Sequence, residues 1–543
     1  MDAGAIVVGA GHNGLICAAY LQRAGIATVV LEARDTIGGC SGTDRALGGA
    51  LVNICNCDHA MVRTTSIPDE LDLGRHGLDY LNVEPAYLHV PWDGGPGWFL
   101  FHDTAATLES LRHSYPGDVA GYERYVRAAM PVVRTITELA QHTPTPGAVF
   151  SGLARRARHA SRAVPTILQW SRRSVGDVVR SYFTAEAVRS PVVTTGPSVW
   201  GLSPETPGTG LGALGYAMRH HAPVGRPRGG SGALPAAIAS SFTAAGGVVR
   251  TGAKVARILC EGGAVVGVEL VGGEVLRAPI VVAATDPKLA LVDWLSNPPH
   301  SANALIANYR DAPVHDGYEA KIDAVIDAPY AVPAVDDAMV RALGLTASQI
   351  SNPSMVVSSS LAQLAEDHRQ QLSGRIAERP QFFVQLPSAL DPSVAAGLPP
   401  GHHVFSLEIL WTPYALAGGW ETTKEPQRWL SKVSELVTMA DGRPFHDHVV
   451  DFRLMGPQEY EREFSMVRGH APAFSGTPLT ALLGRSPELS RYETPVNGLF
   501  LTGAATFPGA GIWGASGRNA ATAILASDGR TARARRAVSA SVA

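Results

Sequence analysis

The sequence predicts an α/β fold in which a Rossmann-like domain, with a parallel sheet flanked by helices, carries a second, inserted α+β domain. Three stretches of the chain predict this fold. The first shows the pattern of a strand, a glycine turn, a helix and a strand; the second, a helix followed by short β-branched runs; the third, a strand, a glycine-rich loop and a helix. Strands that alternate with helices in this way form parallel sheets.

Length and charge exclude several classes of protein. With 543 residues the chain is long enough for two or more structural units and a large buried core. Lys+Arg 45 against Asp+Glu 48 leaves a formal charge of -3, so we expect no nucleic-acid partner. No run of about 18 apolar residues is uninterrupted, so we expect no transmembrane segment. A peripheral apolar face that contacts a membrane stays open as an alternative.

The cysteines indicate the compartment. The chain has 5 of them, an odd number that is low for its length, and four of these lie at or before Cys57. A small secreted protein held by disulfides would show a denser and even set. The first apolar run is interrupted by glycines and is not a signal peptide. We therefore expect a reducing, cytoplasmic location, with a flexible Arg-, Ala- and Ser-rich tail over residues 528–543.

The first stretch has the spacing of a dinucleotide-binding turn. An apolar run over residues 5–8 ends on GAGHNG, and small and apolar residues then recur at helical spacing. In such a turn the first glycine permits the tight bend, the second lets the backbone approach a pyrophosphate, and the third allows the helix to pack closely on the strand. The helix amino terminus adds free N–H groups. We therefore expect Gly9, Gly11 and Gly14 to bind a dinucleotide.

A carboxylate stands where such folds bind ribose. Glu32 follows Gly14 by 18 residues, at the end of the second apolar run, where it can accept hydrogen bonds from two ribose hydroxyls. The pattern G-x-G-x-x-G alone is weak evidence for a dinucleotide site, because residues 210–215 and 509–514 also match it. The match at 210–215 has no strand before it, so we expect a loop there and no second site for NAD(P)H.

The residues after Glu32 favour FAD over NAD. Glu32 is followed six and seven positions later by the pair Gly38-Gly39. This stretch resembles the E-x(5)-G-G extension of FAD-binding folds of the glutathione-reductase and amine-oxidase type, where the extra glycines let the chain pass beside the flavin's pyrophosphate and ribityl arm. We expect these further residues at the cofactor: Asn13, Ala33, Arg34, Gly38, Gly39 and Cys40. Nothing in the sequence indicates a covalent link, so we expect non-covalent FAD.

The two later stretches show similar patterns. Residues 229–287 contain a helical run from Ala233 to Gly246-Gly247, then β-branched runs, and end on an apolar strand at 280–284. Residues 495–527 predict a strand at 499–502, a glycine loop, and a helix from about Ile512. Between the stretches we expect helices over VAGYERYVRAAMPVVRTITELAQ and QRWLSKVSELVTMA and a strand over HVFSLEIL.

Together, GAGHNGLICAAYLQRAG, PRGGSGAL with AAGGVVRTGAKVARI, and GLFLTGAATFPGAGIWGASGRNAA resemble the phytoene desaturase family, most of all its branch of pyridine nucleotide-disulfide oxidoreductase domain 2 proteins. The resemblance implies one FAD domain assembled from residues 1–75, 225–292 and 490–527, and a substrate domain from 76–224 and 293–489. It also implies that Val255 lies beside the adenine and Gly503 near the pyrophosphate and ribityl arm. The backbone of Gly511, Ile512 and Trp513 would then lie at the flavin pyrimidine edge.

The segment NICNCDH, residues 53–59, raises the question of a metal or thiol site. In an extended strand Asn53, Cys55, Cys57 and His59 would share one face, spread too widely to wrap one metal ion. A disulfide between Cys55 and Cys57 would be strained. We therefore expect no metal site, and the resemblance implies that one face lines the substrate cavity. His59 is the candidate catalytic base; a buried, hydrogen-bonded histidine is the alternative.

These observations predict an FAD-dependent oxidoreductase that passes hydride from a C–H bond of an apolar or amphipathic small molecule to flavin N5. Two alternatives stay open: an oxidase of an amine or amino-acid derivative, and a non-catalytic flavin-binding interaction protein. The expected partners are a small-molecule substrate and an electron acceptor such as oxygen or a quinone, and a homodimer is compatible with the sequence.

Overall fold

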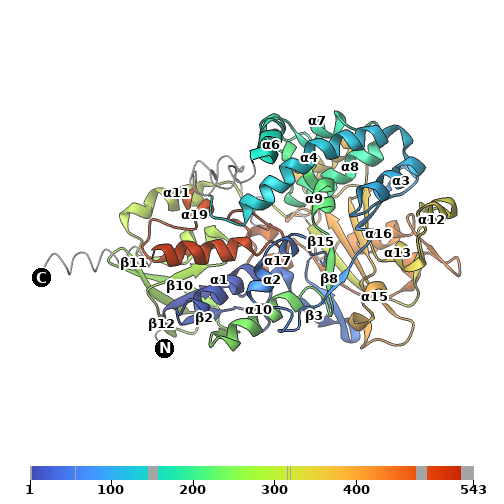
Figure 1. Cartoon of the computed structure of the whole chain (residues 1–543). Helices are drawn as coiled ribbons and strands as arrows, with labels where there is room; N and C mark the ends of the chain where they lie inside the picture. The colour runs from blue at the N-terminus through green and yellow to red at the C-terminus, as the bar shows by residue number, and fades with distance from the viewer. Residues whose placement is uncertain are drawn as a thin grey trace, which may run out of the picture.

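A parallel sheet of five strands lies beside helices α1 and α10 in Figure 1. The computed structural model describes residues 3–55, 57–144, 157–314, 316–317, 319–471 and 486–527. The order of the parallel sheet is β22 (Leu499–Leu501), β13 (Val281–Ala283), β1 (Ala5–Val8), β2 (Thr28–Leu31) and β9 (Val248–Arg250). Three distant stretches of chain supply these strands, so the parallel sheet exists only where the three stretches meet.

Helices cover one face of the parallel sheet. α1 (His12–Arg23) packs against α10 (Ala233–Ala244), and a helix over residues 515–527 lies on the same side. The contact between α1 and the last helix is very close, because a Cβ atom on Gly517 would lie 2.2 Å from the carbonyl oxygen of Asn13. Small residues therefore let the last helix settle directly on the first turn of α1.

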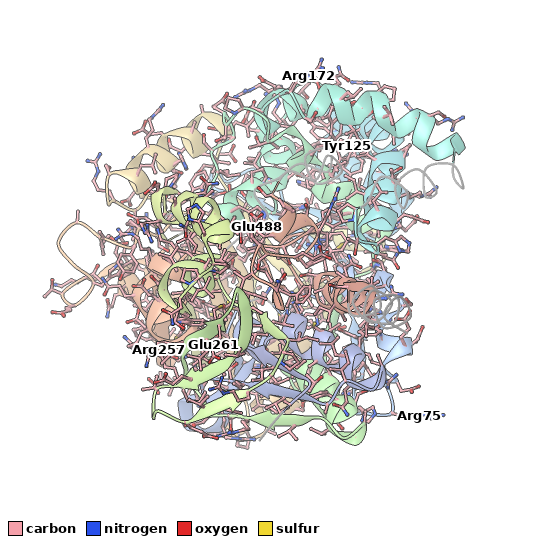
Figure 2. All side chains as sticks on the ribbon, turned by 90° about the vertical axis from the view of Figure 1, so that its left-hand side faces the viewer. Arg75, Tyr125, Arg172, Arg257, Glu261 and Glu488 are labelled. Atoms are coloured by element: carbon pink, nitrogen blue, oxygen red, sulfur yellow. The ribbon has the colours of Figure 1, made fainter. Side chains whose placement is uncertain are left out.

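A second, four-stranded sheet covers the other face. Its order is β12 (Val275–Arg277), β11 (Ala264–Leu270), β10 (Val255–Glu261) and β14 (Leu295–Ser296). Apolar side chains of β10 and β11 pack with Ile6 and Val29 of the parallel sheet. The outer side of this layer is exposed, and Arg257 and Glu261 of β10 point outward in Figure 2.

A seven-stranded sheet forms the core of the other half of the molecule. Its order is β21 (Val449–Met455), β15 (Glu319–Ile326), β19 (His403–Leu410), β18 (Phe382–Gln385), β17 (Ser354–Ser358), β6 (Tyr87–Pro91) and β7 (Trp98–Leu100). All neighbours are antiparallel except β17 and β6. Side chains alternate across this sheet: Ala320, Ile322 and Ala324 of β15 enter an apolar cluster, while the residues between them face the other way.

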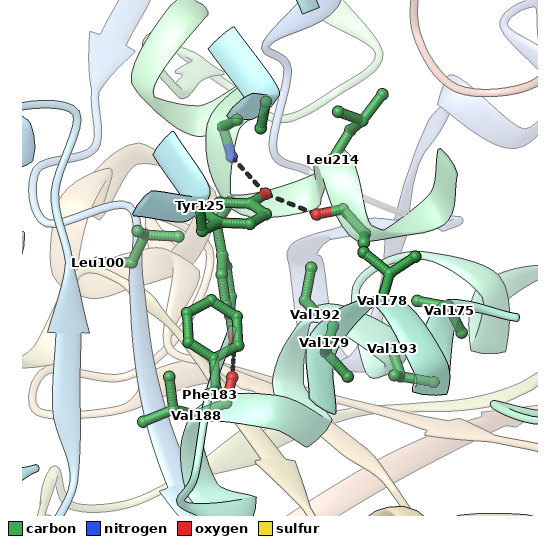
Figure 3. Close-up of a cluster of buried hydrophobic side chains, with 14 of the residues drawn as sticks. Leu100, Tyr125, Val175, Val178, Val179, Phe183, Val188, Val192, Val193 and Leu214 are labelled. Atoms are coloured by element: carbon green, nitrogen blue, oxygen red, sulfur yellow. Dashed lines mark hydrogen bonds between the residues drawn. The ribbon is translucent and has the colours of Figure 1, made fainter. Parts of the chain in front are cut away.

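A group of helices covers β6 and β7 on that other side. It comprises α4 (Val119–Ala140), α6 (Ala157–Trp170), α7 (Val175–Arg180), α8 (Glu186–Thr194) and α9 (Gly215–His221), at the top of Figure 1. Tyr125 of α4 lies among valines of α7 and α8 in Figure 3. Its hydroxyl donates to the carbonyl of Ala213 (2.5 Å) and accepts from the N–H of Ala217 (3.2 Å), in the first turn of α9.

The structure confirms most of the predicted elements. The predicted fold class, a Rossmann-like α/β domain from three segments with an inserted α+β unit, is correct. The predicted strand HVFSLEIL is β19, and the predicted long helix is α4. The helix predicted from about Ile512 begins at residue 515.

Two local predictions are wrong. Residues 210–215 form a 3-10 helix, Gly210–Leu214, and the first residue of α9 instead of a loop. The helix predicted over QRWLSKVSELVTMA ends early: α16 covers Glu425–Val433, and β20 (Thr438–Met439) then pairs with β16 (Tyr330–Ala331). In the second case strand pairing with a distant segment overrides local helix propensity.

No helix in the described part of the chain is long and apolar enough to cross a membrane. The predicted tail over 528–543 lies outside the described residues.

We predict that Tyr125→Phe lowers the free energy of unfolding by about 1–3 kcal/mol, because it leaves the N–H of Ala217 and the carbonyl of Ala213 without their buried partner. Urea denaturation measures the change. The matched control is Tyr115→Phe, whose hydroxyl donates to Pro96 near the surface (2.7 Å). An equal effect of both substitutions would contradict the assigned role of the buried hydroxyl.

Candidate functional site

The glycine turn between β1 and α1 is held by very close backbone contacts. Gly9 has φ +104°, and a Cβ atom there would lie 2.9 Å from the carbonyl oxygen of Ala284. A Cβ atom on Gly14 would lie 2.2 Å from the carbonyl oxygen of Gly9. Any side chain at either position would push α1 away from the parallel sheet, so these two glycines fix where the helix begins.

Gly11 differs from its two neighbours in the motif. Its φ is -66°, which other residues adopt easily, and a Cβ atom there would meet no other atom within 4 Å. The free space lies at the amino terminus of α1, where no side chain caps the helix N–H groups. Gly38 closes the turn by donating its N–H to the carbonyl of Ala10 (2.9 Å), and Gly39 approaches Gly11. Open space beside uncapped N–H groups suits a diphosphate.

Glu32 is fixed beside this turn. Its carboxylate accepts hydrogen bonds from the N–H of Ala10 (2.9 Å) and of Arg34 (3.0 Å), and only 9% of the residue is exposed. A carboxylate offers about four acceptor positions, so two stay available for ribose hydroxyls. The neighbouring Ala33 is exposed. Val255 is buried at the start of β10, two residues after Ala253, whose N–H donates to the carbonyl of Glu32 (2.8 Å).

One guanidinium nitrogen of Arg34 has a polar partner, and another has none in the described part of the chain. Its Nη2 contacts Asp44 at 3.4 Å, and its guanidinium lies 4.4 Å from the ring centroid of Phe464. Its buried Nη1 has no hydrogen-bond partner within the described ranges. A buried guanidinium nitrogen without a partner costs free energy, which an oxygen of a bound cofactor would recover. The turn, Glu32 and Arg34 together therefore fit an adenine dinucleotide.

The carboxyl-terminal loop meets the glycine turn. Gly503 has φ +116° and donates its N–H to Ser516 Oγ (3.0 Å). The carbonyl of Ile512 accepts from the N–H of Val62 (2.8 Å), and Trp513 is buried. Gly511 has φ +98°. The loop thus lies against the segment after NICNCDH.

His12 and Asn13, inside the glycine turn, link these parts. His12 contacts Ser41 through Nδ1 (3.3 Å), and Asn13 Nδ2 donates to His12 Nε2 (3.1 Å). Burial lowers the pKa of His12 to about 4, although a hydrogen bond with the backbone of Gly511 opposes the shift. His12 is therefore neutral at pH 7. No local pattern identifies His12 as a site residue, because it occupies a variable position of the G-x-G-x-x-G motif.

Cys40 lies in a small apolar cluster with Cys55 and Met466. Its Sγ is 3.5 Å from the sulfur of Met466. A hydrogen bond with Cys40 and then burial raise the pKa of Cys55 well above its usual range. Cys55 is therefore a neutral thiol at pH 7, and neutral thiols are weak nucleophiles.

His59 is completely buried. Its Nδ1 contacts the hydroxyl of Tyr80 (3.0 Å), and its Nε2 contacts Ser231 Oγ (2.6 Å). Its N–H and carbonyl both pair with Gly225 (2.9 Å each). Burial, and then the nearby His12, lower the pKa of His59 to about 3. Because both ring nitrogens are occupied by protein hydroxyls, this geometry favours the alternative of a buried, hydrogen-bonded histidine over that of a base.

NICNCDH is not the continuous strand that the sequence predicts. β4 (Ala50–Asn53) ends at the first residue of the segment, having paired only with β3 (Thr43–Ala46). Among the described residues of the segment, Ile54 and Cys55 form a bend, and His59 forms only an isolated bridge with Gly225. Cys57 donates to Gln385 Oε1 (2.9 Å), while Asp58, expected on the opposite face, forms an ion pair close by.

The segment lies on what we call the polar face: the side of the seven-stranded sheet opposite its apolar cluster. Its members come from four adjacent strands, and they are Glu319, Lys321, Asp323, Ser354, Gln385, Ser406 and Glu408. Lys321 contacts Asp323 and donates to the carbonyl of Asn53 (2.7 Å). Burial raises the pKa of Glu319 and of Glu408, which lie beside each other and therefore favour their protonated forms.

Asp58 and Arg226 form a buried ion pair at this face. Arg226 Nε donates to Asp58 Oδ1 (2.7 Å), and its Nη2 donates to Ser354 Oγ (3.1 Å). Burial alone would raise the pKa of Asp58, but the charge of Arg226 and its hydrogen bond lower it below the usual value. Both residues were outside the predicted site, because they stand 168 positions apart and no local pattern connects them.

The described residues contain no group of three or more His, Cys, Asp or Glu side chains suited to a metal ion.

Comparisons with known proteins agree with this geometry. Residues 7–66 match the model of the NAD(P)-binding Rossmann-like domain, and residues 158–314 match that of the flavin containing amine oxidoreductase family. The chain is 29% identical to pyridine nucleotide-disulfide oxidoreductase domain-containing protein 2 of Rattus norvegicus, over 96% of this chain and 93% of that one. It is 24% identical to a lycopene-forming phytoene desaturase of a Paracoccus species, over 96% and 97%.

The fold is also that of a putrescine oxidase solved with bound putrescine, with a TM-score of 0.60 at 17% identity over 97% of this chain and 99% of that one. The matches confirm the predicted resemblance and the predicted class of FAD-dependent oxidoreductase.

We predict that Gly11→Ala leaves the stability of the apoprotein within about 0.5 kcal/mol but weakens FAD binding at least about 10-fold, because the new methyl group enters the open space of the turn. Gly14→Ala should instead destabilise the apoprotein by about 1–3 kcal/mol, because its Cβ would overlap Gly9 and Ala284. Thermal unfolding of apoprotein and fluorescence titration with FAD separate the two effects. Unchanged FAD affinity in Gly11→Ala would refute the placement of the cofactor.

We predict that His59 makes stability fall as the pH is lowered. The unfolded chain protonates this histidine near its ordinary pKa of 6.5, whereas the native state does so only near 3. Between these values the unfolded state binds more protons, so each unit of acidification costs up to about 1.4 kcal/mol. Urea denaturation between pH 7 and pH 5 should show a shallower slope for His59→Asn than for the unchanged protein. His446→Asn, at an exposed position, is the control and should leave the slope as it is.

Proposed function

We propose that this FAD-dependent oxidoreductase binds FAD without a covalent link and oxidises a carbon centre of an apolar or amphipathic small molecule. The observation that carries the proposal is the open turn at Gly11, together with Glu32, which accepts from Ala10 and Arg34, and the free Nη1 of Arg34. The FAD domain would comprise residues 1–75, 225–292 and 490–527, and the substrate domain 76–224 and 293–489.

Each part of the cofactor has a candidate partner in the chain. Gly11, Gly38 and Gly39 would take the pyrophosphate, and Glu32 and Val255 the adenosine. Gly503 and the backbone of 511–513 would hold the ribityl arm and the flavin edge. When bound, the flavin supplies a hydride acceptor at N5. The chain must orient the substrate at that atom, exclude water and accept the proton that leaves as the double bond forms.

The group that accepts the proton would lie on the polar face. The ring nitrogens of His59 are engaged by Tyr80 and Ser231, so we propose that His59 positions the segment 57–62 and holds it against Gly225. Glu319 and Glu408 are titratable groups of this face that lie near Cys55, and burial raises their pKa values. A buried carboxyl group accepts a proton only in its ionised form, so this role requires one member of the pair to be ionised when the substrate is bound.

A non-covalent cofactor agrees with the state of the cysteines. Cys17 is buried in α1, and burial raises the pKa of its thiol to about 12. Cys57 is likewise buried, and its pKa is raised to about 12. Neutral thiols of this kind are poorly suited to form a flavin thioether. We also propose a reducing compartment, the cytoplasm, because Cys40 and Cys55 lie together as free thiols.

Oxidation of an amine is the second candidate, because residues 158–314 match a family of flavin containing amine oxidoreductases. Both reactions break a C–H bond and send its electron pair to the flavin as hydride, while a proton is lost from the neighbouring carbon or nitrogen. Anaerobic mixing with amines, and separately with unsaturated hydrocarbons and their acids, distinguishes them by loss of the visible flavin absorbance.

We predict that the purified protein shows the visible bands of oxidised flavin and that denaturation releases the colour into the supernatant as FAD. Chromatography of the supernatant identifies the released cofactor. Colour that remains with the precipitated chain would refute the non-covalent link. A colourless protein that takes up no added FAD would refute the proposed function itself. Once reduced, the holoprotein should be reoxidised by oxygen or by a soluble quinone, and a flavin that neither reoxidises would favour a non-catalytic role.

A further inference from the structure

Two arginines and one carboxylate meet at the edge of the polar face. Arg226 lies on β8 (Gly225–Pro227) and is only 4% exposed. Arg219 lies on α9, where its Nη2 donates to the hydroxyl of Tyr87 (2.6 Å) and its guanidinium stands 5.0 Å from the ring centroid of Tyr87. Tyr87 is the register partner of Ser354 in the parallel pair of β6 and β17, and Ser354 contacts both Arg226 and Asp58. Arg219 and Arg226 are near each other in the sequence, whereas Asp58 is 168 positions from Arg226 and joins them only in the fold.

The hydrogen bonds of Arg226 leave one nitrogen over. Its Nε is engaged by Asp58 and its Nη2 by Ser354, whereas the buried Nη1 has no partner among the residues that the structure describes. Ser354 cannot provide another bond, because its hydroxyl donates to Asp58 and accepts from Arg226 and from Gln385 Nε2 (2.7 Å). An acceptor for the free Nη1 must therefore come from a group other than Asp58 and Ser354.

The charges do not balance either. Asp58 neutralises one of the two guanidinium groups, and no carboxylate lies within ion-pair distance of Arg219 in the described part of the chain. Lys321 is already paired with Asp323, and burial favours the neutral form of Glu408. The group formed by Arg219, Arg226 and Asp58 thus carries about one excess positive charge at a largely buried position, which favours a monoanionic ligand and opposes an ammonium group.

This group also lies next to the predicted flavin edge. Gly225, the neighbour of Arg226, pairs with His59 through two backbone hydrogen bonds of 2.9 Å. Three residues further on, Val62 donates to the carbonyl of Ile512. Asp58 is therefore separated from the loop 511–513 by a short, tightly held segment. A ligand group at Arg226 would be bound at the same end of the molecule as the predicted hydride acceptor.

We propose that Arg226 and Arg219 form a carboxylate-binding site and that the substrate is an amphipathic carboxylic acid, oxidised in its apolar part. This inference rests on the proposed function and specifies its substrate class. The carboxylate accepts from the free Nη1 of Arg226 and from Arg219, so that a single negative charge completes both the hydrogen bonds and the charge balance. Asp58 and Ser354 act as positioning residues that hold the plane of the Arg226 guanidinium.

Ligand binding to the FAD-loaded, full-length protein tests the proposal. Decanoate, decan-1-ol and decylamine share one apolar chain and differ in the charge of the head group. We expect decanoate to bind at least about 10-fold more tightly than the alcohol, since charge-assisted hydrogen bonds are about twice as strong as neutral ones. Equilibrium dialysis gives the affinities, and the flavin difference spectrum reports whether the ligand reaches the cofactor.

Three variants locate the effect. Arg219→Gln should reduce the preference for decanoate over decan-1-ol to less than about 3-fold. The double variant Asp58→Asn with Arg226→Met removes a charge from each partner, so that no buried ion is left unpaired, and it should have the same effect. Arg379→Gln is the matched control, because Arg379 lies over the ring of Trp92 (5.9 Å) as Arg219 does over Tyr87. It should keep the full preference.

Several outcomes would overturn the proposal. They are equal binding of acid and alcohol, tighter binding of decylamine, absence of binding for any carboxylate from acetate to hexadecanoate, and a preference that survives both site variants. If these occur while the protein still holds reducible FAD, only the carboxylate site fails. If FAD itself is neither bound nor reducible, the proposed function fails as well.

Discussion

The buried charges of the polar face impose the constraint on which the two halves of the molecule depend. Lys321 and Asp323 lie on β15, an interior strand of the seven-stranded sheet, and are 2% and 1% exposed, so neither can be solvated in the usual way. Their remaining partners come from elsewhere: Arg453 contacts both Asp323 (3.1 Å) and Asp44 (3.2 Å), and Asp44 contacts Arg34. Because an unpaired buried ion is costly, this chain of charges joins the segment after β2 to the seven-stranded sheet.

The glycine turn and Glu32 can be predicted from the sequence, because their positions are set by contacts within a short stretch of chain. Gly9 and Gly14 are required by contacts within a few residues of each other and with one neighbouring strand, so their spacing is visible in the chain. Glu32 is visible for the same reason, since the end of a strand fixes its place. The recurrence of helix and strand patterns at 229–287 and 495–527 then allowed the parallel sheet to be predicted from three segments.

The rest of the site depends on contacts that have no local pattern. The alternation EAKIDAVI in β15 indicates a strand with one polar side, and such a side is ordinarily exposed to solvent. Here it is buried, because Asn53, Cys57 and the ion pair of Asp58 with Arg226 lie on it. For NICNCDH we expect an extended strand, but the contacts of Cys57 and Asp58 are set by Gln385 and Arg226, which are 328 and 168 positions away. The contacts of His59 with Tyr80 and Ser231 likewise follow no pattern in the sequence.

The three-segment construction of the parallel sheet has a consequence for biogenesis. Among the described strands β22 pairs with β13 alone, at one edge of the sheet, and more than 200 residues separate the two strands along the chain. At ordinary rates of translation this interval lasts on the order of 10 s or more. During that time β13 has no partner at the edge that β22 later occupies. In the proposed mode of binding, the residues for the ribityl arm and the flavin edge emerge long after those for the adenosine, so the whole cofactor can be captured only once the ribosome has passed the loop 503–514.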